Sequence, residues 1–415
     1  MPEHDVRPTI IGSAAGRRRQ PATPDNAIAA EDDLVAAARG LAPRIRARRT
    51  DIERQRRLPT ELVAAMHELK LFRLFIPAEL GGLETDLLTA ARVVEQVAIA
   101  DGAAGWSLMI GSTYGLMAAL LPRDTARDIY GPSDAVAAGA LRPTGTARVV
   151  EGGYRVDGRW AFASGIPHAT YWNAGCFVME GATRRTTADG APEVRMVFFP
   201  PQDGELIDTW DVGGLRGTGS HDYAVRDLFV PAARSLTMDD RPWAPGALYR
   251  VPIQALLDTS MAAVGLGIGR AAIDAFVELA ASKTASAGSG KPVAERAMAQ
   301  VNVARAEAAL LSARGFLYDT AGGIWDDVLG GRAPDARQLA IARLARINAI
   351  AAAGLAVDLA YEAGGGSSIY TSSPLERCLR DIRTASQHVS MATANYEIIG
   401  RVLLGLPPDR PAHRL

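Results

Sequence analysis

The sequence predicts an α+β protein with three parts in order: an N-terminal helical domain, a central antiparallel β domain and a C-terminal four-helix bundle. The hydrophobic pattern is helical from near Ala29, changes after Pro132 to short runs rich in β-branched and aromatic residues, and is helical again from Pro252. With 415 residues the chain can bury a large core in more than one domain. We therefore predict a flexible tail over 1–27 and domains over 28–132, 133–245 and 246–415.

The two helical parts differ in composition. The segment GSAAGRRRQPATPDN has the composition of a disordered tail, and helical patterns follow it over 31–49, from Pro59, over 87–100 and over 103–121. The run WSLMIGSTYGLMAALL lacks charged residues, and we interpret it as the core helix of a large protein rather than a membrane span. Long Ala-rich helices with short connections predict the bundle, over 252–283, 292–328, 334–364 and 373–404.

Between the helical parts, short runs have the composition of strands, with Gly, Pro and Asp turns between them. The triplet Glu151-Gly152-Gly153 between two such runs predicts a hairpin turn. The expected strands cover 135–141, 147–150, 154–162, 173–179, 194–199 and 224–230.

Composition and charge argue against several classes of function. The formal net charge is −1 and the pI about 6.6, so nothing indicates a nucleic-acid or anionic-membrane partner. Cys176 and Cys378 are too few for a disulfide framework or a zinc site, and we expect no metal. No apolar run reaches the roughly 18 residues of a membrane helix, and the arginine run at 17–19 precedes Gln-Pro rather than an apolar export segment. We expect a cytoplasmic protein.

The stretch from Gly364 to Gly405 carries the strongest signal for a site. It opens with a glycine triplet, passes a proline and continues as a mostly apolar helical pattern. Buried polar groups need partners, so the polar residues in this pattern indicate a helix that lines a ligand site. These residues are Arg380, Asp381, Arg383, Gln387 and His388.

The order G-G-G-S-S-x-x-x-x-S-P-L-x-R-x-x-R-D-x-R-T-A-x-Q-H resembles the C-terminal part of the acyl-CoA dehydrogenase superfamily. More narrowly, it is similar to the branch of two-component flavin monooxygenases. Dehydrogenases of this superfamily carry a catalytic glutamate nine residues after the Arg of the R-D pair, and that position here is Val389. The resemblance instead implies a catalytic role for His388, where the monooxygenase branch has its active-site histidine.

Two motifs of the β part resemble flavin-contacting segments of the same family. Trp160, Phe162, Ser164 and Gly165 match a W-x-F-x-S-G pattern that packs an aromatic ring and a hydroxyl against the flavin, with Ser164 as the expected donor. An ordinary strand followed by a Ser-Gly turn is the alternative. The hairpin WDVGGLRGTGSHDYAV also matches, and there the cofactor candidates are Thr218, Gly219 and Ser220. The role of His221 stays open.

Further contacts follow from the resemblance. Trp106, Tyr114 and His168 are the candidates to face substrate, although His168 could simply cap a turn. The family's bundles pair so that the glycine run before the last helix touches a neighbour's flavin, which implies a homotetramer. This adds Gly364, Gly365, Gly366 and Arg383 to the cofactor candidates.

Other nucleotide motifs fail. The run GSGKP at 288–292 lacks the first glycine of a P-loop, and the glycines at 265–269 have no preceding strand and no final glycine of a dinucleotide fingerprint. Without a Rossmann unit, reduced flavin would come from a separate reductase. The run Ser-Lys-Thr-Ala at 282–285 replaces the family's Arg and aromatic clamp for the adenine of FAD, so FMN is slightly favoured over FADH2.

The sequence therefore predicts the oxygenase component of a two-component flavin monooxygenase. The resemblance implies that reduced flavin and O2 form a flavin C4a-hydroperoxide, which oxygenates a small aromatic or heteroatom-bearing substrate. His388 would act as a base or hydrogen-bond partner. Two alternatives remain: an acyl-CoA dehydrogenase or oxidase whose base is Asp258 or Glu397, and a non-catalytic flavin-binding homologue.

Overall fold

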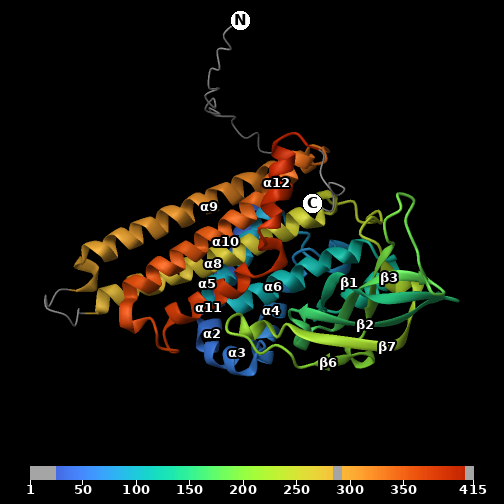
Figure 1. The fold of residues 1–415 in the computed structure, drawn as a ribbon, viewed down its shortest axis with the longest axis horizontal. Coiled ribbons are helices and arrows are strands. Elements are labelled where there is room, and N and C mark those ends of the chain that lie inside the picture. Colours follow the sequence, from blue (N-terminus) through green and yellow to red (C-terminus); the bar gives the residue numbers. More distant parts are fainter. Residues whose placement is uncertain (1–24, 284–291, 407–415) are drawn as a thin grey trace, which may run out of the picture.

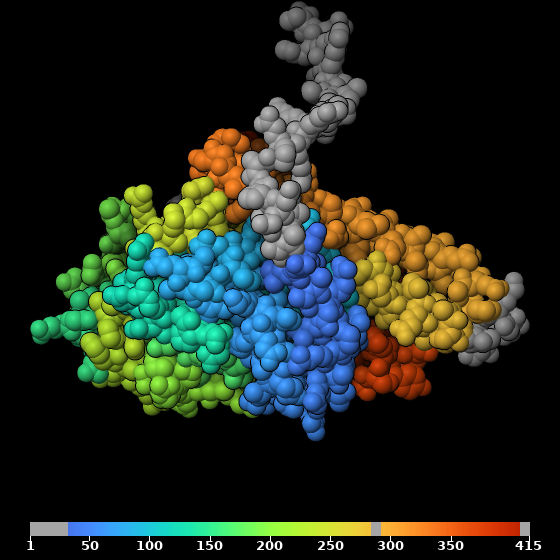
Figure 2. Space-filling model, turned by 180° about the vertical axis from the view of Figure 1, so that it is seen from behind, coloured from blue at the N-terminus to red at the C-terminus, as the bar shows by residue number. Residues whose placement is uncertain are grey.

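The computed structural model describes residues 25–283 and 292–406. The sheet lies at one end of the molecule, the long C-terminal helices lie at the other, and helices α5 (Leu87–Ala100) and α6 (Gly102–Tyr114) pass between them (Figure 1). From behind, the N-terminal helices separate the sheet from the long helices (Figure 2). The tail prediction lies outside the described residues except for 25–27, and so does most of the 288–292 run.

Two of the N-terminal helices, α5 and α6, begin at aspartates whose side chains accept free backbone N–H groups. The Asp86 carboxylate accepts from Leu88 N and Thr89 N and so starts α5, while Asp101 accepts from Ala104 N and starts α6. Helix α6 ends at Tyr114, before the expected 121, and continues as the 3₁₀ turn η3 (Gly115–Ala119). The other N-terminal helices are α1 (Asp25–Gly40), α2 (Ala42–Ala47), α3 (Arg49–Gln55), α4 (Thr60–Glu68) and α7 (Arg123–Tyr130).

The sheet has the strand order β6-β7-β2-β1-β3-β5-β8, with β4 paired to β3. Its strands are β1 (Ala137–Val150), β2 (Gly153–Ala163), β3 (Tyr171–Glu180), β4 (Thr183–Arg184), β5 (Val194–Phe199), β6 (Glu205–Ile207), β7 (His221–Pro231) and β8 (Ser235–Leu236). The expected hairpin at 151–153 joins β1 to β2.

The prediction of a purely antiparallel sheet is wrong, because β1 and β3 pair in parallel. Strand β2 returns antiparallel on one side of β1, and the chain then enters β3 on the other side of β1, in the direction of β1. The strands expected over 135–141 and 147–150 are one strand with an irregularity between Ala140 and Gly145.

Three long helices form the bundle as expected: α8 (Ile253–Ser282), α9 (Ala297–Leu329) and α10 (Ala336–Gly364). Small residues let α8 and α10 approach closely. A Cβ added at Gly265 would lie 2.5 Å from Ile350 Cδ1, so only glycine fits there without a shift of the neighbour. Asp335 and Gln338 form a reciprocal capping box at the start of α10.

The fourth long helix, expected over 373–404, is broken. Helix α11 covers Pro374–Ser386, a 3₁₀ turn η11 covers Val389–Met391 and helix α12 covers Ala394–Leu403. His388 has extended backbone angles, φ −60 and ψ 139, and therefore lies outside both helices. The expectation that His388 belongs to the same helix as Asp381 is wrong for this reason.

Two helices of the bundle, α8 and α10, are long and apolar. Windows in Ile253–Ser282 and Ala336–Ser367 have mean hydropathies of 1.4 and 1.5, although neither was expected to be long and apolar enough to span a membrane. Their many Ala residues raise the mean without an unbroken run of large apolar side chains. The windows are 72% and 61% buried inside the protein, so among the described residues these segments are core helices of the bundle.

Candidate active site

Three hydroxyls form a row where strands β2 and β7 meet. Ser164 Oγ lies 2.7 Å from Ser220 Oγ, and Ser220 Oγ lies 2.6 Å from Thr218 Oγ1. Thr218 donates to the carbonyl of Leu215 (2.8 Å), and the indole N–H of Trp106 in α6 donates to Ser164 (3.1 Å). All three hydroxyl residues are buried, so the row is part of the interior between the sheet and α6.

The two ends of this row fix the direction of its hydrogen bonds. A carbonyl can only accept and an indole N–H can only donate. Thr218 therefore gives its proton to Leu215, Ser220 gives its proton to Thr218, and Ser164 gives its proton to Ser220 while it accepts from Trp106. The oxygen of Ser164 retains one lone pair, and toward a further ligand this hydroxyl is an acceptor. This corrects the expectation that Ser164 acts as a donor.

Left-handed backbone angles bring the two segments together. Gly165 has φ +77 and Gly219 has φ +52, conformations that glycine adopts without strain, and Gly165 N donates to Thr218 O at 2.8 Å. Phe162 (φ +63) and Leu215 (φ +49) also have positive φ, which is costly for large side chains. Such strain gathers at functional sites, where the surrounding structure stabilises it.

The two aromatic side chains of the W-x-F-x-S-G motif lie in different places, Trp160 in the core and Phe162 at the surface. The Trp160 side chain is 0% exposed, its indole N–H donates to Gly175 O (2.7 Å), and its ring stacks on Tyr223. The ring and the N–H of Trp160 are thus occupied by contacts within its own sheet, which corrects the expectation that Trp160 contacts the cofactor. Phe162 is 74% exposed and meets the Trp210 ring edge-on at 6.3 Å, so it is the aromatic side chain of the motif that is free to contact a ligand.

His388 reaches the same region from the opposite side. Its imidazole lies edge-on to the Trp106 ring, 5.7 Å between centroids, and Trp106 is the residue that bonds Ser164. Ser390 N donates to His388 Nδ1 at 3.2 Å, so a neutral imidazole carries its proton on Nε2. Burial and the positive charge of Arg346 lower the pKa of His388 to about 4, which keeps the ring neutral at physiological pH.

Asp258 and Arg346 form a buried ion pair beside this histidine. Asp258 on α8 is 2% exposed and Arg346 on α10 is 1% exposed. Gln254 also donates to Asp258 (2.7 Å), and Arg346 donates a second bond to Ser390 O (2.6 Å). A carboxylate held by a guanidinium is a poor base, so Asp258 is not available for the proton abstraction that the dehydrogenase alternative requires.

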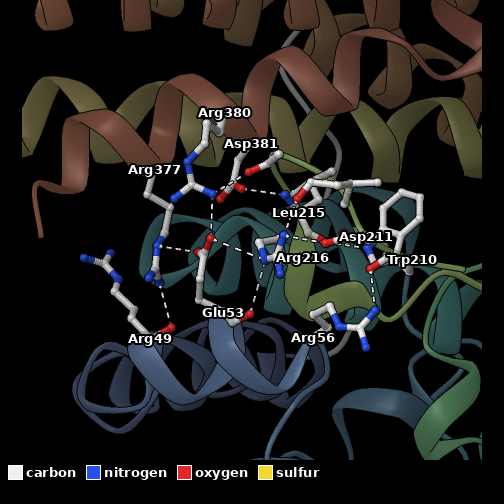
Figure 3. Close-up of polar contacts among 12 residues, drawn as sticks. Arg49, Glu53, Arg56, Trp210, Asp211, Leu215, Arg216, Arg377, Arg380 and Asp381 are labelled. Atoms are coloured by element: carbon white, nitrogen blue, oxygen red, sulfur yellow. Dashed lines mark hydrogen bonds and ion pairs between the residues drawn. The ribbon is translucent and has the colours of Figure 1, made fainter. Parts of the chain in front are cut away.

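An ion-pair network holds the loop that carries the hydroxyl row (Figure 3). Glu53 of α3 lies among three arginines: its carboxylate is 2.5 Å from Arg380, 3.3 Å from Arg377 and 3.8 Å from Arg216. Arg377 and Arg380 belong to α11, while Arg216 belongs to the loop before β7. The network therefore ties the N-terminal helices, the sheet and the last part of the bundle together.

Asp381 connects this network to the site. Its carboxylate accepts from Leu215 N at 2.6 Å, and Leu215 O is the acceptor for Thr218 and for the Trp210 indole. Burial, together with the nearby carboxylate of Asp101, raises the pKa of Asp381 to about 7. The R-D pair thus positions the segment before β7 and does not itself reach Ser164.

The chain matches the profile of the acyl-CoA dehydrogenase N-terminal domain over residues 30–124 and that of the C-terminal domain over 259–393. An indole-3-acetate monooxygenase from Pseudomonas putida is 33% identical over 93% of this chain and 97% of its own length. The flavin-dependent monooxygenase oxygenase subunit HsaA from Rhodococcus jostii is 30% identical over 88% of this chain and 97% of its own. The solved structure of XiaF from a Streptomyces species, in complex with FADH2 and glycerol, superposes with a TM-score of 0.85 at 26% identity, covering 93% and 98% of the two chains.

This chain belongs to the flavin-dependent monooxygenase branch of the acyl-CoA dehydrogenase superfamily. The predicted branch and the helical–sheet–helical fold are thereby confirmed. The residue at the dehydrogenase glutamate position, Val389, is 75% exposed and carries no ionisable group. Glu397, the other candidate base, is exposed on α12. Among the described residues, neither alternative carboxylate is therefore placed to act beside Ser164.

Two of the expected substrate residues make no described hydrogen bond to the hydroxyl row, although His168 Nε2 lies 3.2 Å from where a Cβ at Gly165 would be. Tyr114 is buried, and its hydroxyl donates to Gly139 O at 3.0 Å, which makes it a link between α6 and β1. His168 packs 5.8 Å from the Phe72 ring and lines a cavity of about 860 Å³ together with His67. Neither Ser164 nor His388 lines that cavity. Trp106 alone of the three substrate candidates lies in the site.

The residues in and after the α10–α11 connection that we expect to contact the cofactor have different surroundings. Arg383 pairs with Asp358 at 2.6 Å, and both side chains are largely exposed, so within this chain Arg383 does not approach the hydroxyl row. Gly364 is packed against its own chain, since an added Cβ would lie 2.2 Å from Ser368 Oγ. Gly365 and Gly366 have open space around them, which leaves them free for a contact with another subunit.

Sequence reasoning missed Arg346, Trp210 and Trp106's bond to Ser164. Arg346 follows Arg343 by three residues in an Ala-rich helix, and both arginines are buried. Two cations on the buried face of an apolar helix are a usable signal, because buried charges require partners. The role of Trp210 has no such local signal, since it depends on the loop conformation set by Asp381.

These residues fit a reduced flavin. The exposed Phe162 ring can lie against an aromatic ring system, and Ser164 offers an acceptor lone pair to an N–H group. The dihydro form of the isoalloxazine carries a proton on N5, whereas the oxidised form has only a lone pair there. Thr218 and Ser220, both expected to contact the cofactor, fit instead behind Ser164, where they fix its orientation.

Proposed function

We propose that this protein is the oxygenase component of a two-component flavin-dependent monooxygenase acting on a small aromatic substrate. The observation that carries the proposal is the position of His388, next to the place of the dehydrogenase glutamate. Its imidazole packs edge-on against the Trp106 ring, and the Trp106 indole N–H donates to Ser164. When bound, the reduced flavin supplies electrons that activate O2 for transfer of one oxygen atom. A separate reductase supplies the reduced flavin in this proposal.

The chain itself contributes orientation and a defined hydrogen-bond donor. The neutral imidazole of His388 presents Nε2–H, because Nδ1 is occupied by Ser390 N. We therefore assign His388 the role of hydrogen-bond donor rather than base, which a pKa of about 4 supports. Trp106 of α6 contacts both groups, since its ring meets the imidazole edge-on and its indole N–H donates to Ser164.

Assembly and location are part of the same proposal. We infer a cytoplasmic homotetramer in which the open backbone at Gly365 and Gly366 meets a neighbouring subunit. Arg383 lies on the exposed face of α11 and would contribute to the same contact. The proposed cofactor is reduced FMN or FADH2, with FMN slightly favoured; the hydroxyl row concerns only the isoalloxazine that both share.

The test supplies photochemically reduced FMN or FADH2 and ¹⁸O2 to the purified protein with aromatic substrates, indole-3-acetate and phenols among them. We expect a product that contains one ¹⁸O atom, measured by mass spectrometry, and none when reduced flavin is omitted. In parallel, an acyl-CoA panel with an electron acceptor tests the dehydrogenase alternative. Acyl-CoA oxidation without any ¹⁸O incorporation would overturn the proposal.

A further inference from the structure

The ion pair between Asp258 and Arg346 is one of the most buried charged contacts of the described chain. It joins the beginning of α8 to α10, and Arg346 also contacts Ser390 in the segment that follows α11. Burial of two charges costs desolvation that their attraction barely repays, and an apolar pair of similar volume often stabilises a protein as well or better. The pair is thus a weak source of stability, which points to a specific use.

The second hydrogen bond of Arg346 identifies that use. Nη1 faces Asp258 and Nη2 donates to Ser390 O at 2.6 Å, so a guanidinium fixed by α8 holds the chain segment that follows α11. Ser390 in turn donates its N–H to His388 Nδ1 at 3.2 Å. The contacts form one continuous path: Asp258, Arg346, the two backbone groups of Ser390, and the imidazole of His388.

Other contacts also shape the turn: His388 N donates to Ala385 O (3.2 Å), Met391 N donates to His388 O (2.7 Å), and the Met391 side chain packs against the core. His388 and Ser390 are half-buried, Val389 is exposed, and the residues lie between two helices rather than inside one. Asn395 of α12 donates to Val389 O (3.1 Å) and Ala392 O (2.9 Å), which holds the far side of the turn from an exposed position. Arg346 is the buried anchor that approaches the turn from the bundle core.

We propose that Asp258 and Arg346 are positioning residues that hold the 388–391 turn in the conformation in which His388 presents Nε2–H beside Trp106. Asp258 fixes the guanidinium, Arg346 fixes Ser390 O, and Ser390 N–H fixes the ring and its tautomer. This inference rests on the proposed function in one respect, because the proposed function states what the oriented His388 does. The position of the turn can be tested without any oxygenation reaction.

The first experiment measures the reactivity of His388 with diethyl pyrocarbonate in flavin-free protein. The reagent acylates the lone pair of a neutral imidazole, which for His388 is the Nδ1 that Ser390 N–H occupies. The tryptic peptide over 384–401 contains His388 as its single histidine, so mass spectrometry reads its modification directly. We expect Arg346→Met to raise the modification rate about fivefold, the change that loss of one hydrogen bond allows.

Matched variants separate positioning from loss of fold. Arg346→Lys keeps the charge and one donor and should restore slow modification in part. The double variant Asp258→Asn with Arg346→Gln leaves no unpaired buried charge, so it should fold, yet its shorter side chain should release the turn as Arg346→Met does. Arg270→Met removes an α8 arginine that pairs with Glu307 (2.8 Å) elsewhere in the bundle and should leave His388 unchanged.

The second experiment measures the coupling ratio, product formed per O2 consumed, with reduced flavin and an accepted substrate. The protein is kept in excess over the reduced flavin, because free reduced flavin consumes O2 without forming product. Under this condition partial unfolding leaves the ratio unchanged, whereas a displaced imidazole lowers it. Slow His388 modification and an unchanged ratio in both Arg346→Met and the double variant would overturn the inference. If no protein oxygenates any substrate but the modification rates change as expected, the positioning role stands and the proposed function fails.

Discussion

The direction of the hydroxyl row makes a quantitative prediction about flavin binding. Ser164 gives its proton to Ser220 (2.7 Å), so its free lone pair suits the N5–H of a reduced flavin and not the N5 lone pair of the oxidised form. In Ser220→Ala the Ser164 proton has no acceptor in the row and becomes available to oxidised flavin. A typical hydrogen bond contributes about 1 kcal/mol, or about fivefold in Kd. We therefore expect oxidised flavin to bind about fivefold tighter and reduced flavin to change little.

The assay is a pair of titrations, with oxidised flavin followed by fluorescence quenching and with reduced flavin under anaerobic conditions. The quantity of interest is the ratio of the two Kd values, which cancels general loss of binding. Ser112→Ala is the matched control, because Ser112 is a buried serine of α6 whose hydroxyl bonds only its own helix, at Leu108 O (2.7 Å). A ratio in Ser220→Ala equal to that of the control, or one shifted further toward reduced flavin, would refute the assigned direction.

Further predictions concern His388, Asp381 and the assembly. In His388→Leu we expect product formation to fall by about 10²-fold or more, with excess hydrogen peroxide. His388→Gln keeps an N–H donor and should retain more of the product formed per O2 consumed. Equal losses in the two variants would show that His388 does not act as a hydrogen-bond donor. Because His388 titrates near pH 4, the coupling ratio should show no inflection from this group between about pH 6 and 8. The raised pKa of Asp381, about 7 against 3.8, means that the folded state keeps a proton that the unfolded chain has lost, so this stabilisation is complete at low pH and is lost as the pH rises through about 7. The Tm of Asp381→Asn relative to the parent should therefore increase from about pH 5 to 8, and a flat difference in thermal melts would contradict the burial of an uncharged carboxyl. Small-angle scattering at micromolar concentration should give a tetramer, and a monomer would remove the shared-subunit contact at Gly365.

The fold could be read from the sequence because hydrophobic period and glycine turns are local signals. The long helices α8, α9 and α10 and the strands β2, β3, β5 and β7 all overlap their expected ranges. The parallel pairing of β1 with β3 could not be read in this way. It depends on which side of β1 the chain chooses after β2, and strand composition carries no information about that choice.

The site shows the same limit at the level of single residues. The W-x-F-x-S-G motif identified the right segment, but alternation along β2 decides which aromatic faces the core, and a positive φ at Phe162 disturbs that alternation. Trp160 and Phe162, both expected to contact the cofactor, therefore differ in the structure: Trp160 is buried and Phe162 is exposed. The acceptor role of Ser164 is even harder to predict from the sequence, because it depends on hydrogen-bond partners in α6 and in the segment before β7.

The R-D…Q-H motif gives the clearest view of what a sequence pattern encodes. A continuous helix would place Asp381 and His388 on one face as two parts of one site. In the structure the helix ends between them, and each reaches the site by a different route. Asp381 accepts from Leu215 N and so sets the loop on which Thr218 orients the hydroxyls, while His388 is held through Ser390 by Arg346 and presents its ring to Trp106. The motif therefore contains two residues that contribute to opposite sides of the site, Asp381 through Leu215 and His388 through its ring. They can do so from one short segment because helix α11 ends at Ser386, between them.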